Sequence, residues 1–212
     1  KAAAAAFLEL ARERDAGAGL LGTLGLDPVG RRARTGEGPD VDDVVPTATA
    51  VSSEFPRVRA VVVDALPVHG AGASDAQELG FSLAAGVAYL RALTGAALDL
   101  ATAAGLLEFR YAATAEQFPT IAKLRAARRL WSRVTEASGQ PLPQFQHAVC
   151  SPSMLTRRDV HGNLLRGTVA CFAAGVGGAD AVTVAPFDAA VGEPDTFSRR
   201  IARNTQSLLV QE

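Results

Sequence analysis

The chain has 212 residues, of which 48% are hydrophobic and 20% are charged, so it can bury one sizeable core as a globular domain does. Its formal net charge is −1, which argues against a nucleic-acid partner, because such binding needs a surplus of basic side chains. The apolar stretches Ala2–Leu10 and Val61–Ala65 are too short to cross a membrane and no export signal is evident, so we expect a cytoplasmic protein.

The first part of the chain is expected to stand apart from the main core. Residues 1–14 are rich in alanine and predict a helix, and the apolar run Leu20–Leu26 predicts a short strand. The segment Gly30–Asp43 is polar and rich in glycine, which predicts a loop or linker. We therefore expect an N-terminal helix, short strand and linker over residues 1–43, and a β/α region over residues 44–212.

From residue 44 onward, strand patterns and helix patterns alternate. Val58–Ala65 is an almost continuous β-branched run, which is typical of a strand buried on both faces of a parallel sheet. In Phe118–Val134 the apolar residues recur at steps of three and four, which predicts a helix with one buried face and its five cations on a solvated flank. The other predicted elements are helices over 44–55, 74–93, 98–104, 159–174 and 197–210, strands over 106–113, 144–150 and 181–185, and a loop over 67–73.

This order of elements predicts an α/β fold with parallel strands joined by right-handed crossovers. A (β/α)8 barrel usually needs about 250 residues, so about five β/α units predict a partial barrel of the TIM type. A doubly wound open sheet is the alternative. Such a sheet usually has a glycine-rich phosphate loop after its first strand, and the run Gly22–Gly25 does not have that pattern.

The candidate chemical groups are few. Barrel enzymes place their chemistry at the carboxyl ends of the strands, and His69 and His147 lie on or beside such ends. Histidine can act as a general acid or orient a thioester carbonyl, but two histidines without a carboxylate cluster more often make single structural hydrogen bonds. We expect a structural role for His161, which lies near a predicted helix start.

Other kinds of site lack support in the sequence. No HExxH, CxxC or close grouping of histidine and acidic residues predicts a metal site. Ser151 and Ser153 flank Pro152, but no GxSxG segment predicts a nucleophilic triad. The two cysteines, Cys150 and Cys171, have no metal-ligand spacing and are expected to be buried and reduced.

Three segments resemble one protein family in the same order along the chain. Ala71–Leu79 resembles an "EAGADAxxELA" run, Ile121–Trp131 (IAKLRAARRLW) a signature helix, and Ser198–Gln206 (SRRIARNTQ) an "ARIARNTQ" run. All three belong to the barrel domain of the methylmalonyl-CoA mutase family, the adenosylcobalamin-dependent mutases that rearrange acyl-CoA carbon skeletons. The resemblance covers roughly residues 20–212 and favours the barrel, as a portion of a longer chain.

The chain departs from the family at positions that the resemblance associates with catalysis. The family has a Tyr-His-x-Gln-Glu-Ala-Gly segment where this chain has Leu66–Gly72. Pro67 stands at the position of the catalytic histidine, and His69 stands at the position of the glutamine. An Arg-Leu-Ser triplet becomes Leu106–Glu108, which places an acidic side chain where it would repel CoA phosphates.

The family's acyl-CoA run Gly-Thr-x-Gln-Asn-Asp is only partly kept. Gly22, Thr23 and Asp27 match, whereas the glutamine and asparagine are replaced, and no substrate-binding arginine aligns near Thr35. By the resemblance, His147 alone matches a CoA-contacting position, so it is the one expected substrate-binding residue. We expect no catalytic, cofactor-binding or metal-binding residue in this chain.

The resemblance therefore implies the small subunit of a heterodimeric mutase that interconverts methylmalonyl-CoA and succinyl-CoA. Such a subunit has a degenerate barrel and pairs with a large catalytic subunit, which holds the adenosylcobalamin. Two alternatives remain at this stage: a catalytic acyl-CoA mutase with altered specificity, and a stand-alone ligand-binding barrel fragment.

Overall fold

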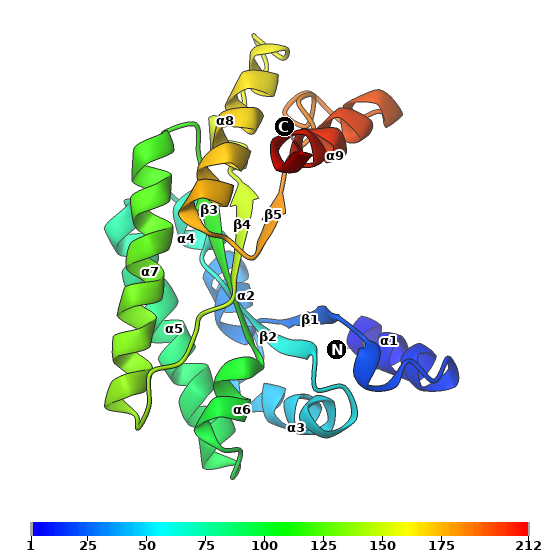
Figure 1. Ribbon diagram of the computed structural model, residues 1–212, viewed down its shortest axis with the longest axis vertical. Coiled ribbons are helices and arrows are strands. Elements are labelled where there is room, and N and C mark those ends of the chain that lie inside the picture. Colours follow the sequence, from blue (N-terminus) through cyan, green and yellow to red (C-terminus); the bar gives the residue numbers. More distant parts are fainter. Residues whose placement is uncertain (1, 212) are drawn as a thin grey trace. The chain divides into compact units, whose positions relative to one another are not determined.

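The structure is a computed structural model that describes residues 2–211 (Figure 1). It has an α/β fold in which the strands follow one another in the sheet in the order β1-β2-β3-β4-β5. β1 pairs with β2, and β4 with β5, in parallel. The strands are β1 (Gly22–Leu26), β2 (Val58–Asp64), β3 (Leu107–Ala113), β4 (Gln146–Cys150) and β5 (Ala181–Thr183).

Helices separate the strands along the chain, as a series of β/α units requires. This arrangement agrees with the predicted partial (β/α) barrel, in which sequential strands are neighbours. The helices are α1 (Ala2–Glu13), α2 (Pro28–Thr35), α3 (Val45–Glu54), α4 (Leu66–Gly70), α5 (Asp75–Gly95), α6 (Leu100–Gly105), α7 (Gln117–Ala137), α8 (Gly162–Gly177) and α9 (Thr196–Gln211). Within the described part of the chain, no helix combines the length and the apolar character needed to cross a bilayer.

The chain divides into two compact units, which are described separately. The first unit contains the chain up to Asp64 together with Phe81–Phe109 and Trp131–Phe145. The second unit contains Ala65–Gly80, Arg110–Leu130 and the chain from Gln146 onward.

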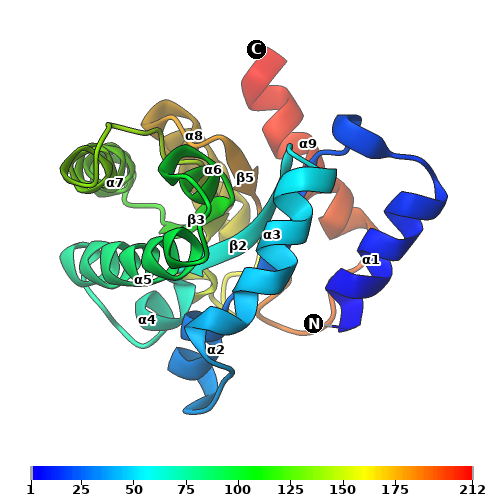
Figure 2. The same cartoon turned by 90° about the horizontal axis from the view of Figure 1, so that it is seen from below.

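The core of the first unit is built on β2, whose residues are almost all buried, with α3 lying along the strand (Figure 2). Trp131 of α7 and Phe109 of β3 are both fully buried, and their ring centroids are 4.6 Å apart. Gly86 of α5 faces the same pair, where a Cβ would lie 2.9 Å from the Phe109 ring. A side chain larger than hydrogen at this position would therefore displace the aromatic rings.

In the second unit, α7 and α8 pack closely through a glycine. A Cβ at Gly177 would lie 2.8 Å from the Leu124 side chain. Arg128 of α7 donates hydrogen bonds to the carbonyls of Gly177 and Gly178, the latter at 3.0 Å, and so satisfies the last turn of α8. Gly178 ends α8 in the left-handed conformation with φ of 82°, which glycine adopts without strain.

The five cations of α7 were predicted to lie on a solvated flank, and this prediction is correct for only some of them. Arg125, Arg129 and Arg133 are exposed, but Lys123 is 3% exposed. Its ammonium lies 2.7 Å from Glu78 and 2.8 Å from Asp75. The prediction is wrong for Lys123 because its two carboxylate partners come from α5, and Glu78 lies 45 residues away in the sequence.

Two segments predicted as loops are helical. In Gly30–Asp43, α2 forms because Asp27 caps it by accepting from the Gly30 N–H, and Gly36 ends it with φ of 76°. In the predicted loop over 67–73, the short helix α4 includes Pro67 in its first turn, where proline needs no N–H partner.

Most of the other predicted elements are confirmed within a few residues of their expected ends. A capping box forms at the start of α5: the Ser74 N–H donates to Gln77 Oε1 at 2.9 Å, and the Gln77 N–H donates to Ser74 Oγ at 3.4 Å. Cys150 and Cys171 are buried free thiols, as predicted.

Candidate functional site

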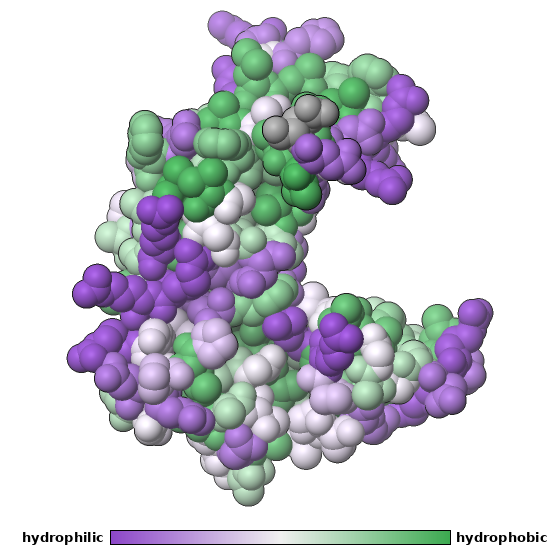
Figure 3. All heavy atoms as spheres, in the orientation of Figure 1, coloured by the Kyte–Doolittle hydropathy of each residue, from purple (hydrophilic) through white to green (hydrophobic). Residues whose placement is uncertain are grey.

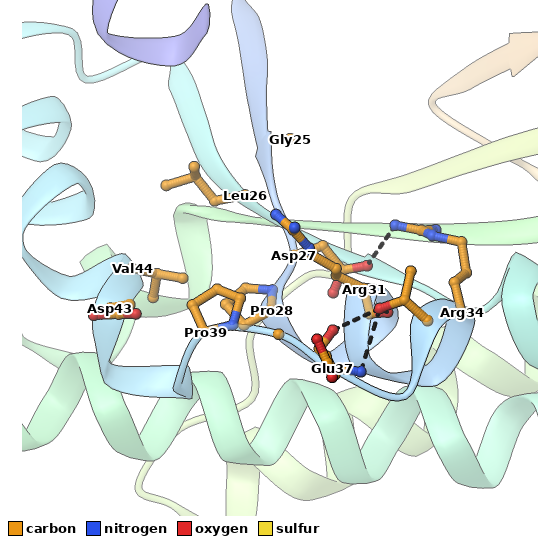
Figure 4. Close-up of a pocket in the computed structure, with 12 residues that line it drawn as sticks. Gly25, Leu26, Asp27, Pro28, Arg31, Arg34, Glu37, Pro39, Asp43 and Val44 are labelled. Atoms are coloured by element: carbon orange, nitrogen blue, oxygen red, sulfur yellow. Dashed lines mark hydrogen bonds and ion pairs between the residues drawn. The ribbon is translucent and has the colours of Figure 1, made fainter. Parts of the chain in front are cut away.

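A cavity of about 810 Å³ lies at the carboxyl end of β1 in the first unit (Figure 4). β1 ends at Leu26 and α2 begins at Pro28, so the turn between them forms part of the cavity wall. The helix α2 and the residues that follow it supply most of the other lining side chains. Because barrel enzymes carry their sites at the carboxyl ends of their strands, this cavity is the first candidate site.

Asp27 is the most buried charged group of this cavity, with 6% of its side chain exposed. Its Oδ1 accepts hydrogen bonds from the Gly30 N–H and the Tyr89 hydroxyl, both at 2.8 Å. Its Oδ2 is buried and has no hydrogen-bond partner among residues 2–211. Burial raises the pKa of Asp27 above its ordinary value of 3.8, and burial raises the pKa of Tyr89 as well.

Arg34 of α2 is held by two carboxylates. Its Nη1 donates to Asp64 Oδ2 at 2.8 Å, and its Nη2 lies 4.0 Å from Asp27 Oδ2. Figure 4 shows the guanidinium turned toward Asp27. The positive charge of Arg34 is therefore largely balanced by Asp64 and Asp27.

A second polar cluster lies in the second unit, where His69 of α4 contacts two buried groups. Its Nε2 is 2.7 Å from Ser151 Oγ, and its Nδ1 is 3.4 Å from Glu78 Oε2. The order serine, histidine, carboxylate is that of a nucleophilic triad. Sequence reasoning missed this arrangement, because Ser151 lies 82 residues from His69 and outside any recognisable motif.

The surroundings of this cluster favour a structural role. Ser151 has 0% exposure, and its Oγ already accepts from the Ser153 N–H at 3.2 Å. Glu78 is bound by Lys123 and by the Ala112 N–H at 2.8 Å, so its charge is compensated without the histidine. A nucleophile needs access to substrate, which this buried hydroxyl lacks.

The other two histidines are not among the residues that line the cavity. His147 on β4 is half-buried, and its Nε2 lies 2.7 Å from Thr183 Oγ1 on β5. His161 immediately precedes α8 and stacks on Phe187, with ring centroids 5.7 Å apart. Glu108, expected to oppose CoA phosphates, is 4% exposed on β3.

A more apolar groove of about 600 Å³ lies in the second unit between α8, β5 and the end of α9. Figure 3 shows hydrophobic side chains over this part of α8 and α9. Phe172, Val176 and Leu209 line the groove and are each at least a third exposed. Asp180 is the one ionisable acid among the described lining residues, and it accepts from the Gln146 N–H at 2.8 Å.

The family comparison covers almost the whole chain. The profile of the family described as methylmalonyl-CoA mutase matches residues 18–212. The chain belongs to the methylmalonyl-CoA mutase family. The predicted resemblance is thus confirmed.

Curated relatives in this family carry subunit names. The methylmalonyl-CoA mutase small subunit of Streptomyces virginiae is 61% identical over 194 residues, which are 90% of this chain and 32% of that protein. The small subunit of Propionibacterium freudenreichii subsp. shermanii is 42% identical, over 89% of this chain and 30% of its own. The large subunit of Streptomyces virginiae is 37% identical, over 76% of this chain and 22% of its own. The chain spans about a third of the length of these small-subunit relatives.

Arg34 is the main residue of the cavity that the sequence analysis did not predict. The family resemblance gave no substrate-binding arginine near Thr35, yet the neighbouring residue Arg34 reaches the cavity from α2. The signal was present in Asp27-Pro28 and Gly36, which together predict a capped helix over this segment. Because the segment was predicted to be a loop, the helix face that carries Arg34 was not predicted.

Each histidine of the chain already has a partner among the described residues. His69 and His147 each contact a hydroxyl group, and His161 stacks on an aromatic ring. Within residues 2–211 there is no group of three or more histidine, cysteine or acidic side chains placed to hold a metal ion.

We predict that the stability of the chain depends on pH through Asp27. Because its pKa is raised in the folded state, protonated Asp27 favours folding below the ordinary value of 3.8, and this contribution is lost as pH rises through the raised value. Asp27→Asn keeps an oxygen that accepts from Gly30 and Tyr89 but carries no charge.

Urea denaturation between pH 3.5 and pH 7 measures this effect. Relative to the wild type, Asp27→Asn should gain stability with rising pH until the raised pKa is passed, and the difference should then stay constant. Asp42→Asn, which changes an exposed carboxylate of the same region, is the matched control and should show no such trend. A wild type that gains stability over Asp27→Asn as pH rises would contradict the assigned direction.

Proposed function

We propose that this chain is the barrel portion of the small subunit of an adenosylcobalamin-dependent methylmalonyl-CoA mutase, an isomerase that interconverts methylmalonyl-CoA and succinyl-CoA. We further propose that the chain itself is catalytically inactive and serves as a scaffold for the large catalytic subunit. The names of its relatives support the first part of the proposal. The observation that carries the second part is the neutralised cavity, in which Arg34 is already paired with Asp64 and lies near Asp27.

The charge of the cavity supports a degenerate site. Two arginines, Arg31 and Arg34, line it together with the carboxylates Asp27, Glu37 and Asp43, and Arg34 is bonded to a fourth carboxylate, Asp64. Negative groups therefore outnumber positive ones around this cavity. This balance opposes CoA binding at short range.

The partner and cofactor follow from this proposal. A large subunit would bind the adenosylcobalamin and carry out the rearrangement, and the present chain would stabilise it by association. His147 remains the proposed contact to the acyl-CoA, since it is half-buried and its bond to Thr183 fixes its ring. The cytoplasmic location stays a prediction.

Co-expression with a large subunit tests the partnership. We expect the two chains to purify together, and we expect the cobalamin to follow the large chain when the complex is separated in mild denaturant. Cobalamin that stays with the small chain after separation would contradict the proposed division of roles.

We predict that restoring the missing histidine does not restore catalysis. Pro67→His should give no measurable mutase turnover with adenosylcobalamin and methylmalonyl-CoA, because the polar groups at Gly25 and Leu26 are also absent. The assay should follow succinyl-CoA formation by chromatography, with a catalytic mutase as the positive control. Turnover above background by Pro67→His would show that the site is less degenerate than proposed.

A further inference from the structure

We draw no further inference here: the strongest candidate, the apolar groove that α8, β5 and the end of α9 form in the second unit, carries none, because nothing in the structure shows what covers it.

Discussion

Replacing Lys123 by methionine is expected to lower the free energy of unfolding by about 3–5 kcal/mol. The Lys123 ammonium lies 2.7 Å from Glu78, and the two side chains are 1% and 0% exposed. Methionine fills a similar volume but carries no charge, so Glu78 would keep a buried carboxylate without its cation. Urea denaturation monitored by circular dichroism measures the loss.

The same helix offers a matched control. Arg125 is exposed and lies two residues from Lys123, so Arg125→Met should change the free energy of unfolding by no more than about 0.5 kcal/mol. The double variant Lys123→Met with Glu78→Gln should recover part of the stability, because the carboxylate charge is then removed as well. A cost below about 1 kcal/mol for Lys123→Met would mean that the buried pair is not required for folding.

Trp131→Ala should destabilise the first unit by about 3–5 kcal/mol. Trp131 is fully buried and packs against Phe109 at 4.6 Å, with Gly86 leaving room for both rings. Removal of the indole leaves a cavity that this close-packed region cannot fill without moving the backbone of α5.

Leu130 provides the comparison for this variant. It precedes Trp131 on α7 but is 40% exposed, so Leu130→Ala should cost less than about 1 kcal/mol. The two variants are compared by thermal and urea denaturation under the same conditions. Equal losses for Trp131→Ala and Leu130→Ala would refute the assignment of Trp131 to the core.

Local sequence patterns were enough to predict most of the elements. The β-branched run from Val58 predicted the buried strand β2, and the apolar spacing in α7 placed Leu124 and Trp131 on its buried face. Both predictions rest on the period of the side chains along one element, which the sequence shows directly. The capping box of Ser74 and Gln77 at the start of α5 is a signal of the same local kind, since it lies within four residues.

The candidate sites could not be predicted in the same way, because their partners are distant in the sequence. Arg34 pairs with Asp64 thirty residues away, and His69 with Ser151 eighty-two residues away. No local pattern shows which strand ends lie close together. The charge balance of the cavity and the burial of Ser151 could therefore be seen only in the structure. The helix α2 is a different case, because local signals for it are present in the sequence. Asp27 and Pro28 indicate a helix start and Gly36 indicates a helix end, but the polar composition of the segment favoured the prediction of a loop.

Mutase turnover in a reconstitution experiment tests the central claim most directly. The protein that contains this chain, its large partner, and an equimolar mixture of the two would each be assayed with adenosylcobalamin and methylmalonyl-CoA. The account predicts succinyl-CoA formation by the mixture and none by the protein that contains this chain when assayed alone. Turnover by that protein alone, at a rate comparable to that of the mixture, would contradict it.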